Sequence, residues 1–406
     1  MRATGGVDFI TNGAGLTVDG NDVQQQVSGN CEVGSTIRAI NPDGSVVCES
    51  HDARPGSFGV SPDTAGDVGD TTSIIIGTDG FPLISYYDTT NGDLKVIHCE
   101  NLICSNPNFT ITTLDSSGDV GFYTSVTIGN DGLGLIAYTQ RDSGLKVAHC
   151  NNLACTSATI TTLETGLIRN QVSIVTGVDG MGLISFHRQD AEGKLKVAHC
   201  SNTVCTAATI TEIDTAGLVG EYSSITIGAD GMGLISYFDN YNGKLKVAHC
   251  SNLSCTSATT STIADGGGGT SITLGSDGLG LISYLNGASN IAVAHCDNLT
   301  CSSATTATID SVVGYQTSIT IGSDGLGLVA YRENTGNSLK VAHCSNMTCS
   351  SASTINFDFS SDTGFGNSVT IGTDGMPIIS YYNSTYGDLN IFHCSNVFCL
   401  PNFIRR

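Results

Sequence analysis

The chain has 406 residues and a formal net charge of −21, with 16 Lys and Arg against 37 Asp and Glu. Such an acidic chain lacks the Lys/Arg footprint that nucleic-acid phosphates or an anionic membrane surface require, which argues against both partners. Glycine (50 residues), Thr, Ser, Ile and Val give a composition typical of β-strands and turns. Sixteen cysteines, all in close sequence pairs, predict an oxidising location, either extracellular or on a cell surface.

Residues 1–50 differ from the rest, and we expect them to form a separate connector. Short alternating runs broken by glycine lead to a predicted β-hairpin, in which Cys31 and Cys48 bracket an Asn-Pro-Asp-Gly turn at 41–44. The region has too little apolar surface for a core of its own. Residues 1–6 lack the apolar run of a signal peptide. We therefore expect the chain to be part of a longer exported polypeptide.

The Gly-Ala-Gly-Leu-Thr run at 13–17 and the Cys-bracketed hairpin resemble the stalk-to-head connectors of phage tail fibres and bacterial surface fibres. The resemblance covers this N-terminal region alone. In such fibres it implies trimerisation. For this chain it implies self-association through residues 1–50.

Residues 51–406 contain a repeat of about 50 residues, a period typical of arrays and propellers. Each repeat carries two cysteines separated by four residues, the second of which is Asn, with a His directly before the first cysteine. The pairs are Cys99/Cys104, Cys150/Cys155, Cys200/Cys205, Cys250/Cys255, Cys296/Cys301, Cys344/Cys349 and Cys394/Cys399. The histidines are His98, His149, His199, His249, His295, His343 and His393.

One repeat parses into four short extended segments, which we call strands A to D. In the second repeat they are predicted at 125–129, 135–138, 145–150 and 158–163. Four strands with short turns are typical of one propeller blade. Seven repeats therefore predict an all-β fold, a seven-bladed β-propeller, over residues 51–406.

The last repeat ends too soon after Cys399 for a complete strand D. Residues 63–69, ahead of the first blade, are similar to residues 115–121, which follow a strand D. We therefore expect residues 57–62 to supply the outer strand of the last blade, which removes an exposed sheet edge. The alternative is that residues 402–406 form that strand.

The repeated cysteines flank the predicted C–D hairpin, where the Cα atoms of flanking residues lie at the roughly 5.5 Å separation that a disulfide needs. The central Asn suits a turn, because its side chain can bond to the turn's own backbone and the residue tolerates left-handed geometry. Each His is expected to pack between neighbouring sheets and to bond to a backbone carbonyl. A zinc site is the alternative reading, but adjacent His and Cys on a strand point to opposite faces and supply too few ligands.

An Asp-Gly dipeptide recurs at every A–B turn, from Asp79-Gly80 to Asp374-Gly375. It predicts a tight hairpin with positive φ. The alternative is a ring of Ca²⁺ sites, although lone carboxylates supply few oxygens. We expect no cofactor, with calcium as the alternative.

The A–B and C–D turns, which share one face of a propeller, are nearly the same in every repeat, whereas the B–C and D–A loops of the opposite face differ. Function on a repeat scaffold usually lies where the units diverge. Tyr, Asn, Asp and Arg in these loops suit hydrogen bonding to sugar hydroxyls and aromatic stacking, and neutral drift in solvated loops is the alternative. The predicted ligand-binding residues are Tyr87, Asp88, Arg141, Arg169, Arg188, Tyr222, Asp239, Tyr241, Arg332 and Tyr386.

The stretch Ile76–Asp88 and its counterparts resemble the repeats of bacterial extracellular sialidase-like (BNR-type) propellers. The resemblance implies the fold. A sialidase needs an arginine cluster, a Tyr/Glu nucleophile pair and an acid, whereas this chain has no Trp for the Ser-x-Asp-x-Gly-x-Thr-Trp box and carries its loop arginines on separate blades. A glycosidase needs two carboxylates at a defined separation, and spacing selects no pair among Asp190, Glu192, Glu221, Asp239 and Glu333.

We therefore expect a non-enzymatic binding module whose variable face recognises a glycan or a cell-surface protein. The alternative is a purely structural subunit of a surface fibre, and a weaker alternative is a glycosidase-like enzyme.

Asn-x-Ser/Thr sequons that a glycosylating host could modify lie at Asn108, Asn252, Asn298, Asn346 and Asn383.

Overall fold

The computed structural model describes residues 16–18, 21–24, 35–40, 46–50, 58–141, 143–189, 193–357 and 362–399. It divides into two compact units, Met1–Gly56 and Ser57–Arg406. The division therefore falls after residue 56, whereas the sequence places it after residue 50.

The first unit contains two small antiparallel sheets. Strand β1 (Leu16–Val18) pairs with β2 (Asn21–Gln24), and β3 (Ser35–Ile40) pairs with β4 (Val46–Ser50). Ile40 lies opposite Val46, as a hairpin over this stretch requires. The predicted partner of Cys48, Cys31, lies outside the described residues, so that disulfide stays a prediction.

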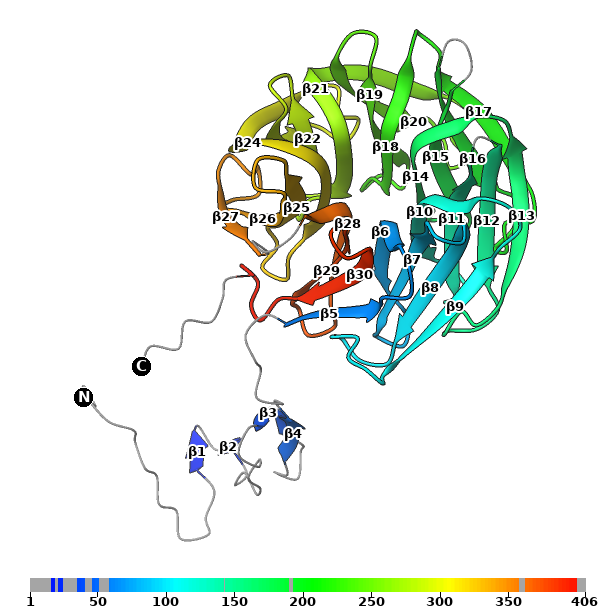
Figure 1. Cartoon of the computed structure of the whole chain (residues 1–406). Coiled ribbons are helices and arrows are strands. Elements are labelled where there is room, and N and C mark those ends of the chain that lie inside the picture. Colours follow the sequence, from blue (N-terminus) through cyan, green and yellow to red (C-terminus); the bar gives the residue numbers. More distant parts are fainter. Residues whose placement is uncertain are drawn as a thin grey trace. The chain divides into compact units, whose positions relative to one another are not determined.

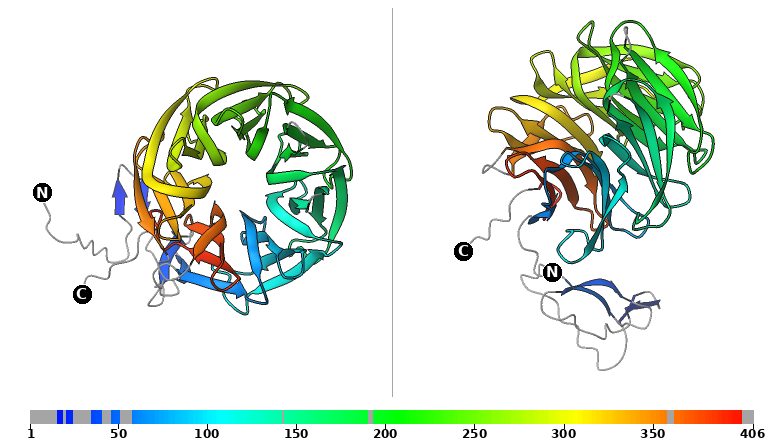
Figure 2. Two further views of the ribbon diagram at one scale, coloured as in Figure 1. Left: turned by 45° about the horizontal axis from the view of Figure 1, so that its top comes forward. Right: turned by 45° about the vertical axis from the view of Figure 1, so that its right-hand side comes forward.

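The second unit is a ring of seven four-stranded antiparallel blades, so the predicted seven-bladed β-propeller is confirmed (Figures 1 and 2). From the axis outward, blade 1 is β6 (Val68–Ile76), β7 (Pro82–Asp88), β8 (Asp93–Cys99) and β9 (Phe109–Asp115). Blade 2 is β10 (Val120–Ile128), β11 (Gly134–Gln140), β12 (Gly144–Cys150) and β13 (Ala158–Thr165). Blade 3 is β14 (Ile168–Thr176), β15 (Gly182–Arg188), β16 (Lys194–Cys200) and β17 (Ala208–Asp214).

Two long strands each serve two blades, because they run from the rim of one blade to the axis of the next. Blade 4 is β18 (Val219–Ile227), β19 (Gly233–Asp239), β20 (Lys244–Cys250) and the first part of β21 (Ala258–Leu274). Blade 5 is the rest of β21, β22 (Gly280–Asn286), β23 (Asn290–Cys296) and the first part of β24 (Ala304–Ile321). Blade 6 is the rest of β24, β25 (Gly327–Glu333), β26 (Ser338–Cys344) and β27 (Ala352–Asn356).

Blade 7 is built from both ends of the propeller segment. It comprises β28 (Thr363–Ile371), β29 (Pro377–Asn383), β30 (Asp388–His393) and, as its outer strand, β5 (Phe58–Asp63) (Figure 1). Strand β5 lies one residue beyond the segment 57–62 expected to close the ring, and Gly59 pairs with Phe392. The alternative strand at 402–406 lies outside the described residues.

A serine on each inner strand joins neighbouring blades at the centre of the ring. Its hydroxyl accepts a hydrogen bond from a backbone N–H of the next blade, at 3.0 to 3.3 Å. The series runs from Ser73, which accepts from Val126, to Ser368, which accepts from Ile74. Because this last bond joins blade 7 to blade 1, the ring is closed at its axis as well as at its rim.

The hydrophobic core is divided into seven clusters, one at each junction between blades. At the junction of blades 7 and 1, for example, Ile84 and Ile97 pack with Ile378 and Leu389. Middle strands are covered by a sheet on either side, so every residue of β7 and β12 is buried, and most residues of their counterparts are too. Stability therefore depends on blades meeting their neighbours, as in other repeat proteins.

Buried polar contacts, which we call junction triads, join four pairs of blades. The carboxylate that ends the outer strand of one blade accepts hydrogen bonds from a Tyr and a Lys of the next blade. The triads are Asp63 with Tyr86 and Lys95, Asp115 with Tyr138 and Lys146, Asp214 with Tyr237 and Lys246, and Asp310 with Tyr331 and Lys340. Burial alone would raise the pKa of Asp63, Asp115 and Asp214, but the Lys and Tyr hydrogen bonds outweigh it and lower the pKa.

The predicted pairing of the propeller cysteines is confirmed in all seven blades. The Cα atoms of each pair lie 4.8 to 5.0 Å apart, and no described cysteine is free. All fourteen cysteines are fully buried, so they belong to the scaffold and not to a surface that a ligand could reach. The bridges are Cys99–Cys104, Cys150–Cys155, Cys200–Cys205, Cys250–Cys255, Cys296–Cys301, Cys344–Cys349 and Cys394–Cys399.

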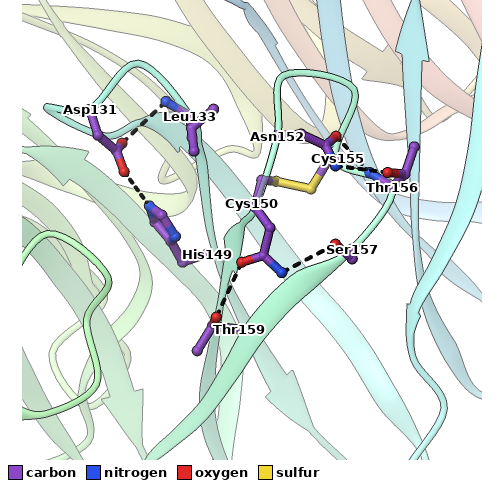
Figure 3. The surroundings of a disulfide bond; sticks show 10 residues. Asp131, Leu133, His149, Cys150, Asn152, Cys155, Thr156, Ser157 and Thr159 are labelled. Carbon is purple, nitrogen blue, oxygen red and sulfur yellow. Dashed lines mark hydrogen bonds and ion pairs between the residues drawn. A yellow bond between two sulfur atoms is a disulfide. The ribbon is translucent and has the colours of Figure 1, made fainter.

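The predicted bond between the central Asn side chain and the backbone of the disulfide turn is confirmed. The left-handed residue of the turn is the second cysteine of each pair, with φ between 48° and 57°, and not the Asn. Asn152 braces the turn, because its side chain accepts the N–H of Thr156 and donates to that residue's hydroxyl (Figure 3). The left-handed cysteines are Cys104, Cys155, Cys205, Cys255, Cys301, Cys349 and Cys399.

In five blades the repeated His hydrogen-bonds to a carboxylate and not to the predicted backbone carbonyl, and in blades 6 and 7 the same two side chains lie at ion-pair distance. In Figure 3, Nε2 of His149 lies 2.8 Å from Oδ2 of Asp131, while Oδ1 of Asp131 accepts the N–H of Leu133. Equivalent His–Asp distances in all seven blades are 2.7 to 3.0 Å. The Asp-Gly carboxylate thus holds the A–B turn against strand C, which leaves it little capacity to bind calcium. The left-handed residue of this turn is the Gly, with φ of 82° at Gly132.

Candidate functional site

The inner strand of each blade is irregular where it leaves the D–A loop. Six of these strands carry a residue with positive φ there: Thr71, Tyr123, Gln171, Tyr222, Gly269 and Gly366. The pairing register also shifts at this point, as a β-bulge requires. A narrow cavity of about 30 Å³, lined from six blades by residues that include Thr71, Tyr123, Gln171, Gly269, Gln316 and Gly366, shows that the bulges face the axis.

Aromatic and charged side chains gather on one side of this axial opening, on blades 6, 7, 1 and 2. Ring contacts, ion pairs and hydrogen bonds join them into two groups, one that runs from Tyr315 to Asp67 and one around Tyr87. Asp70, which pairs with Tyr87 between β6 and β7, lies three residues from Asp67 in the chain and so adjoins both groups. We call the whole set the mouth belt. Its members are Asp67, Asp70, Tyr87, Asp119, Phe122, Tyr123, Arg141, Tyr315, Arg332, Asp362, Phe365 and Tyr382.

Arg332 organises the part of the belt on blades 6 and 7. Its Nη2 donates to Asp362 at 2.7 Å, and its guanidinium lies 3.9 Å from the centre of the Phe365 ring. Phe365 also contacts Tyr315 and Tyr382, with ring centres 6.0 and 6.5 Å apart. Arg332 is buried, so it holds the belt together, whereas Tyr315 is 47% exposed.

Tyr87 and Arg141 organise the part of the belt on blades 1 and 2. The Tyr87 hydroxyl donates to Asp119 at 2.5 Å, and Arg141 contacts the other oxygen of that carboxylate at 3.3 Å. Phe122 packs edge-on against Tyr87 and lies below the guanidinium of Arg141, at 5.0 and 5.3 Å. Arg141 is exposed on the surface of this group.

The belt carries a net negative charge, because it holds four carboxylates and two guanidinium groups. Burial raises the pKa of Asp70, and the charge of Asp67 raises it further, while the Thr71 N–H and Arg141 act in the opposite direction. Burial and the Asp119 hydrogen bond raise the pKa of Tyr87. Near the axis, burial followed by the charges of Tyr315, Glu221 and Tyr123 raises the pKa of Tyr222 to about 12. Tyr222 therefore stays a neutral hydroxyl across the physiological range.

Of the predicted binding residues, Tyr87, Arg141 and Arg332 lie in the belt, and Tyr222 faces it across the axis. Tyr241 and Tyr386 stand at the tips of B–C loops and are 76% and 68% exposed. These six residues therefore line or border the variable face.

The other predicted binding residues have partners within the scaffold. Asp88 and Asp239 are buried and cap their B–C turns, where each accepts the backbone N–H and the side-chain amide of an Asn three residues on. Arg188 donates to Glu164 and to the carbonyl of Thr165. Arg169 is exposed on β14, opposite His187. Arg169 and Arg188 thus share blade 3, so the expectation that the loop arginines lie on separate blades was wrong for this pair.

The described candidate carboxylates each have a partner within the scaffold. Glu221 and Asp239 lie on the paired strands β18 and β19, where Glu221 accepts a hydrogen bond from Asn240 at 3.2 Å and Asp239 caps its turn. Glu333, on blade 6, lies 3.7 Å from Lys340. Asp190 and Glu192 lie outside the described residues. The positions of the described carboxylates Glu221, Asp239 and Glu333 therefore single out no catalytic pair.

Several belt residues escaped sequence reasoning, above all Asp67, Asp70, Asp119, Phe122, Phe365 and Tyr382. A signal was present, because Tyr87, Arg332 and Tyr382 occupy the same position in strand B of their blades. Each reaches an Asp in the following D–A loop, namely Asp119, Asp362 or Asp67. An alignment of the repeats, position by position, would have predicted that each of these strand B residues contacts the Asp of the following D–A loop.

Among the described residues, no group of three or more His, Cys, Asp or Glu side chains is arranged to hold a metal ion. No helix in the part of the chain that the structure describes has the length and apolar character needed to span a membrane.

No protein-family model and no curated protein matches the chain. Solved structures do match it, and each of the three that follow covers 84% of this chain. Polysaccharide lyase Uly1 has 10% identity and a TM-score of 0.54 over 92% of its own length. An α-L-arabinanase of Penicillium chrysogenum, complexed with arabinobiose, has 11% identity and a TM-score of 0.51, and 99% of its own length is covered. The Dos1 propeller has 8% identity and a TM-score of 0.50, and 95% of its own length is covered. Such likenesses show the fold alone.

Proposed function

We propose that this protein is an extracellular or surface-displayed binding module that holds a glycan at the mouth belt. The observation that carries the proposal is the gathering of aromatic, hydroxyl, guanidinium and carboxylate groups on four consecutive blades, in two contact groups that adjoin at Asp67 and Asp70. The belt lies on the face where the repeats diverge and loops protrude, the usual place for a site on such a scaffold. The seven disulfides support an oxidising, extracellular location.

The chemistry of the belt favours a neutral glycan. Carboxylates and hydroxyls hydrogen-bond to sugar hydroxyls, and the exposed faces of Tyr315 and its neighbours offer apolar surface to a sugar ring. An anionic ligand is disfavoured because the belt has an excess of carboxylates, and because Arg141 and Arg332 are each paired with an Asp. The resemblance to sialidase-like repeats therefore extends, in this proposal, to the scaffold and not to binding of a sugar carboxylate.

Tyr241 and Tyr386 extend the proposed site, because both aromatic rings are exposed at loop tips of the same face. Tyr222 supplies a neutral hydroxyl near the axis. Residues 1–50, which resemble fibre connectors, are proposed to join the propeller to a stalk and to self-associate. The molecule would then act as a lectin-like head or adhesin of a fibre.

A purely structural role in a surface fibre is the second candidate. The observation that favours it is the repeated bracing of the opposite face, where every blade has both a disulfide and a His–Asp contact. Such a role requires no ligand, and self-association through residues 1–50 would then be the only binding activity.

A glycan array followed by titration calorimetry with the strongest binder tests the proposal. Tyr315→Ala and Arg141→Ala remove exposed belt side chains and are expected to weaken binding at least tenfold. Val178→Ala, which truncates an exposed side chain on an A–B turn of the opposite face, is the matched control and should bind as wild type. Binding that neither belt variant changes would refute the mouth belt as the site, and the absence of any glycan ligand would favour the structural role.

A further inference from the structure

The junction between blades 4 and 5 lacks the charged residues that occupy four of its counterparts. Leu195 of blade 3 pairs with Asp214, and Leu245 of blade 4 pairs with Ala264, so Ala264 stands where the triads have a carboxylate. Tyr237 pairs with Lys246, whereas Tyr284 pairs with Ala292, so Ala292 stands where the triads have a lysine. Both charges of the triad are therefore missing, and its tyrosine, Tyr284, remains.

A cavity of about 480 Å³ lies at this junction. Its wall includes Ala264, Asp265, Tyr284, Asn286, Thr306 and Thr308. The volume is within the range of small-molecule sites, roughly 300 to 1,000 Å³. Ala264, at the carboxylate position of the triad, lines the cavity, and Ala292, at the lysine position, pairs with the lining residues Tyr284 and Thr308.

The loop beside the cavity leaves it open. The B–C turn of blade 5 consists of Gly287, Ala288 and Ser289, whereas Tyr241 and Tyr386 occupy the corresponding loops of blades 4 and 7. A second cavity of about 290 Å³, lined in part by Phe238 and Leu285, shares Asn286 and Gly287 with the first. The two cavities thus adjoin the same short turn of the variable face.

We propose that the cavity between blades 4 and 5 binds one neutral sugar residue of a glycan, as a site separate from the mouth belt. This inference rests on the proposed function for the class of ligand. Hydroxyls of Tyr284, Thr306 and Thr308 and the carboxylate of Asp265 line one cavity, where they match the alternating donors and acceptors of a sugar ring. Ile263, Ala264 and Ala307 supply apolar surface beside them.

Hydrogen bonds within the protein hold polar side chains of the cavity in place before any ligand binds. Asn286 accepts the N–H groups of Ala288 and Asn290, and its amide donates to the hydroxyl of Thr308 at 3.1 Å. Side chains held in this way lose little freedom on binding. The charge of the site favours a neutral ligand, because Asp265 repels anions and a cation would have to compete with Lys244, which already pairs with that carboxylate.

The decisive variant is Ala264→Asp combined with Ala292→Lys, which rebuilds the triad found at other junctions and fills the cavity. We expect it to fold, to melt no lower than wild type, and to lose binding at least tenfold in calorimetric titrations. The probes are neutral gluco-, galacto-, manno- and arabino-oligosaccharides. Tyr284→Phe removes one hydroxyl at a position where blade 3 has Phe186, and should weaken binding severalfold without loss of fold. Tyr138→Phe, in the triad of blades 1 and 2, is its matched control and should leave binding unchanged.

The outcomes separate this site from the mouth belt. Loss of binding in the filled variant and in Tyr284→Phe supports the inference. Wild-type binding by both, together with weakened binding by Tyr315→Ala, overturns it and leaves the proposed function standing. If Tyr315→Ala and Arg141→Ala bind normally while the filled variant does not, the cavity is the site and the mouth belt is not. If the filled variant fails to fold, Tyr284→Phe and Thr308→Val decide, and no binding of any probe by wild type overturns both proposals.

Discussion

The hydroxyl of Ser368 accepts a hydrogen bond from the backbone N–H of Ile74 at 3.2 Å, across a separation of 294 residues in the sequence. It is the same bond that joins every other pair of neighbouring blades at the axis. The seam between the first and last blades is therefore as complete as the other junctions. Strand β5 closes the same seam at the rim.

Deletion of residues 1–62 should lower the melting temperature markedly, because it removes almost all of β5 and exposes the edge of β30. Deletion of residues 1–63 also removes Asp63, and the loss of one partner from a buried charge contact costs roughly 3–5 kcal/mol. Thermal unfolding followed by circular dichroism measures both effects. Deletion of residues 1–50 is the control, since it keeps β5, and it should melt like the full chain. An unchanged melting temperature after deletion of 1–62 would mean that β5 does not close the ring.

The junction triads predict loss of stability in acid. The pKa of Asp63, Asp115 and Asp214 is lowered in the folded state, so each carboxylate binds its proton less tightly there than in the unfolded chain. Their contribution is complete above the unfolded pKa of about 4 and falls as the pH drops toward the folded values. Denaturant unfolding between pH 7 and pH 2.5 should show this decline. Stability that stays constant down to pH 3 would contradict it.

A double variant tests the triad at blades 1 and 2 at neutral pH. Asp115→Ala alone leaves Lys146 buried without its carboxylate and should cost roughly 3–5 kcal/mol. Asp115→Ala with Lys146→Ala copies the natural pair Ala264 and Ala292 and should cost less than the single variant. Free energies of unfolding from urea titrations give the comparison. A double variant less stable than Asp115→Ala would show that the charges do not act as a pair.

Asp70 is expected to respond to pH in the opposite sense. Burial raises its pKa in the folded protein, so the folded state binds that proton more tightly than the unfolded chain does, and the ionised group opposes folding. Asp70→Asn should therefore raise the melting temperature at pH 7, with a smaller gain near pH 4. Melting curves across this range test it. A destabilised Asp70→Asn at pH 7 would show that the ionised carboxylate is needed for the fold of the mouth belt.

The disulfide turns should contribute to stability separately. Removing the Cys150–Cys155 bridge with paired serines should cost roughly 2 kcal/mol, the chain-entropy value for so short a loop. Alkylation of the unreduced, unfolded protein followed by mass spectrometry should label none of the fourteen propeller cysteines. Labelled cysteines in native material would contradict the bridged turns.

The amino-acid sequence by itself determined the number of blades, the four strands of each, the pairing of propeller cysteines and the segment that closes the ring. These features depend on local patterns that recur seven times, so the repeats reinforce one another. It also separated the braced face from the variable one, because turns with nearly identical sequences must lie on the same side of equivalent blades.

Only the tertiary structure decided which loop residues meet. Asp67 and Tyr382 are 315 positions apart, yet a hydrogen bond of 2.6 Å joins them in the mouth belt. Neither the spacing of these two residues nor the sequence around them predicts this contact, since it forms only when blade 7 packs against blade 1. The cavity between blades 4 and 5 has the same origin, because Ala264 of blade 4 and Tyr284 of blade 5 line one space only when the neighbouring sheets pack together.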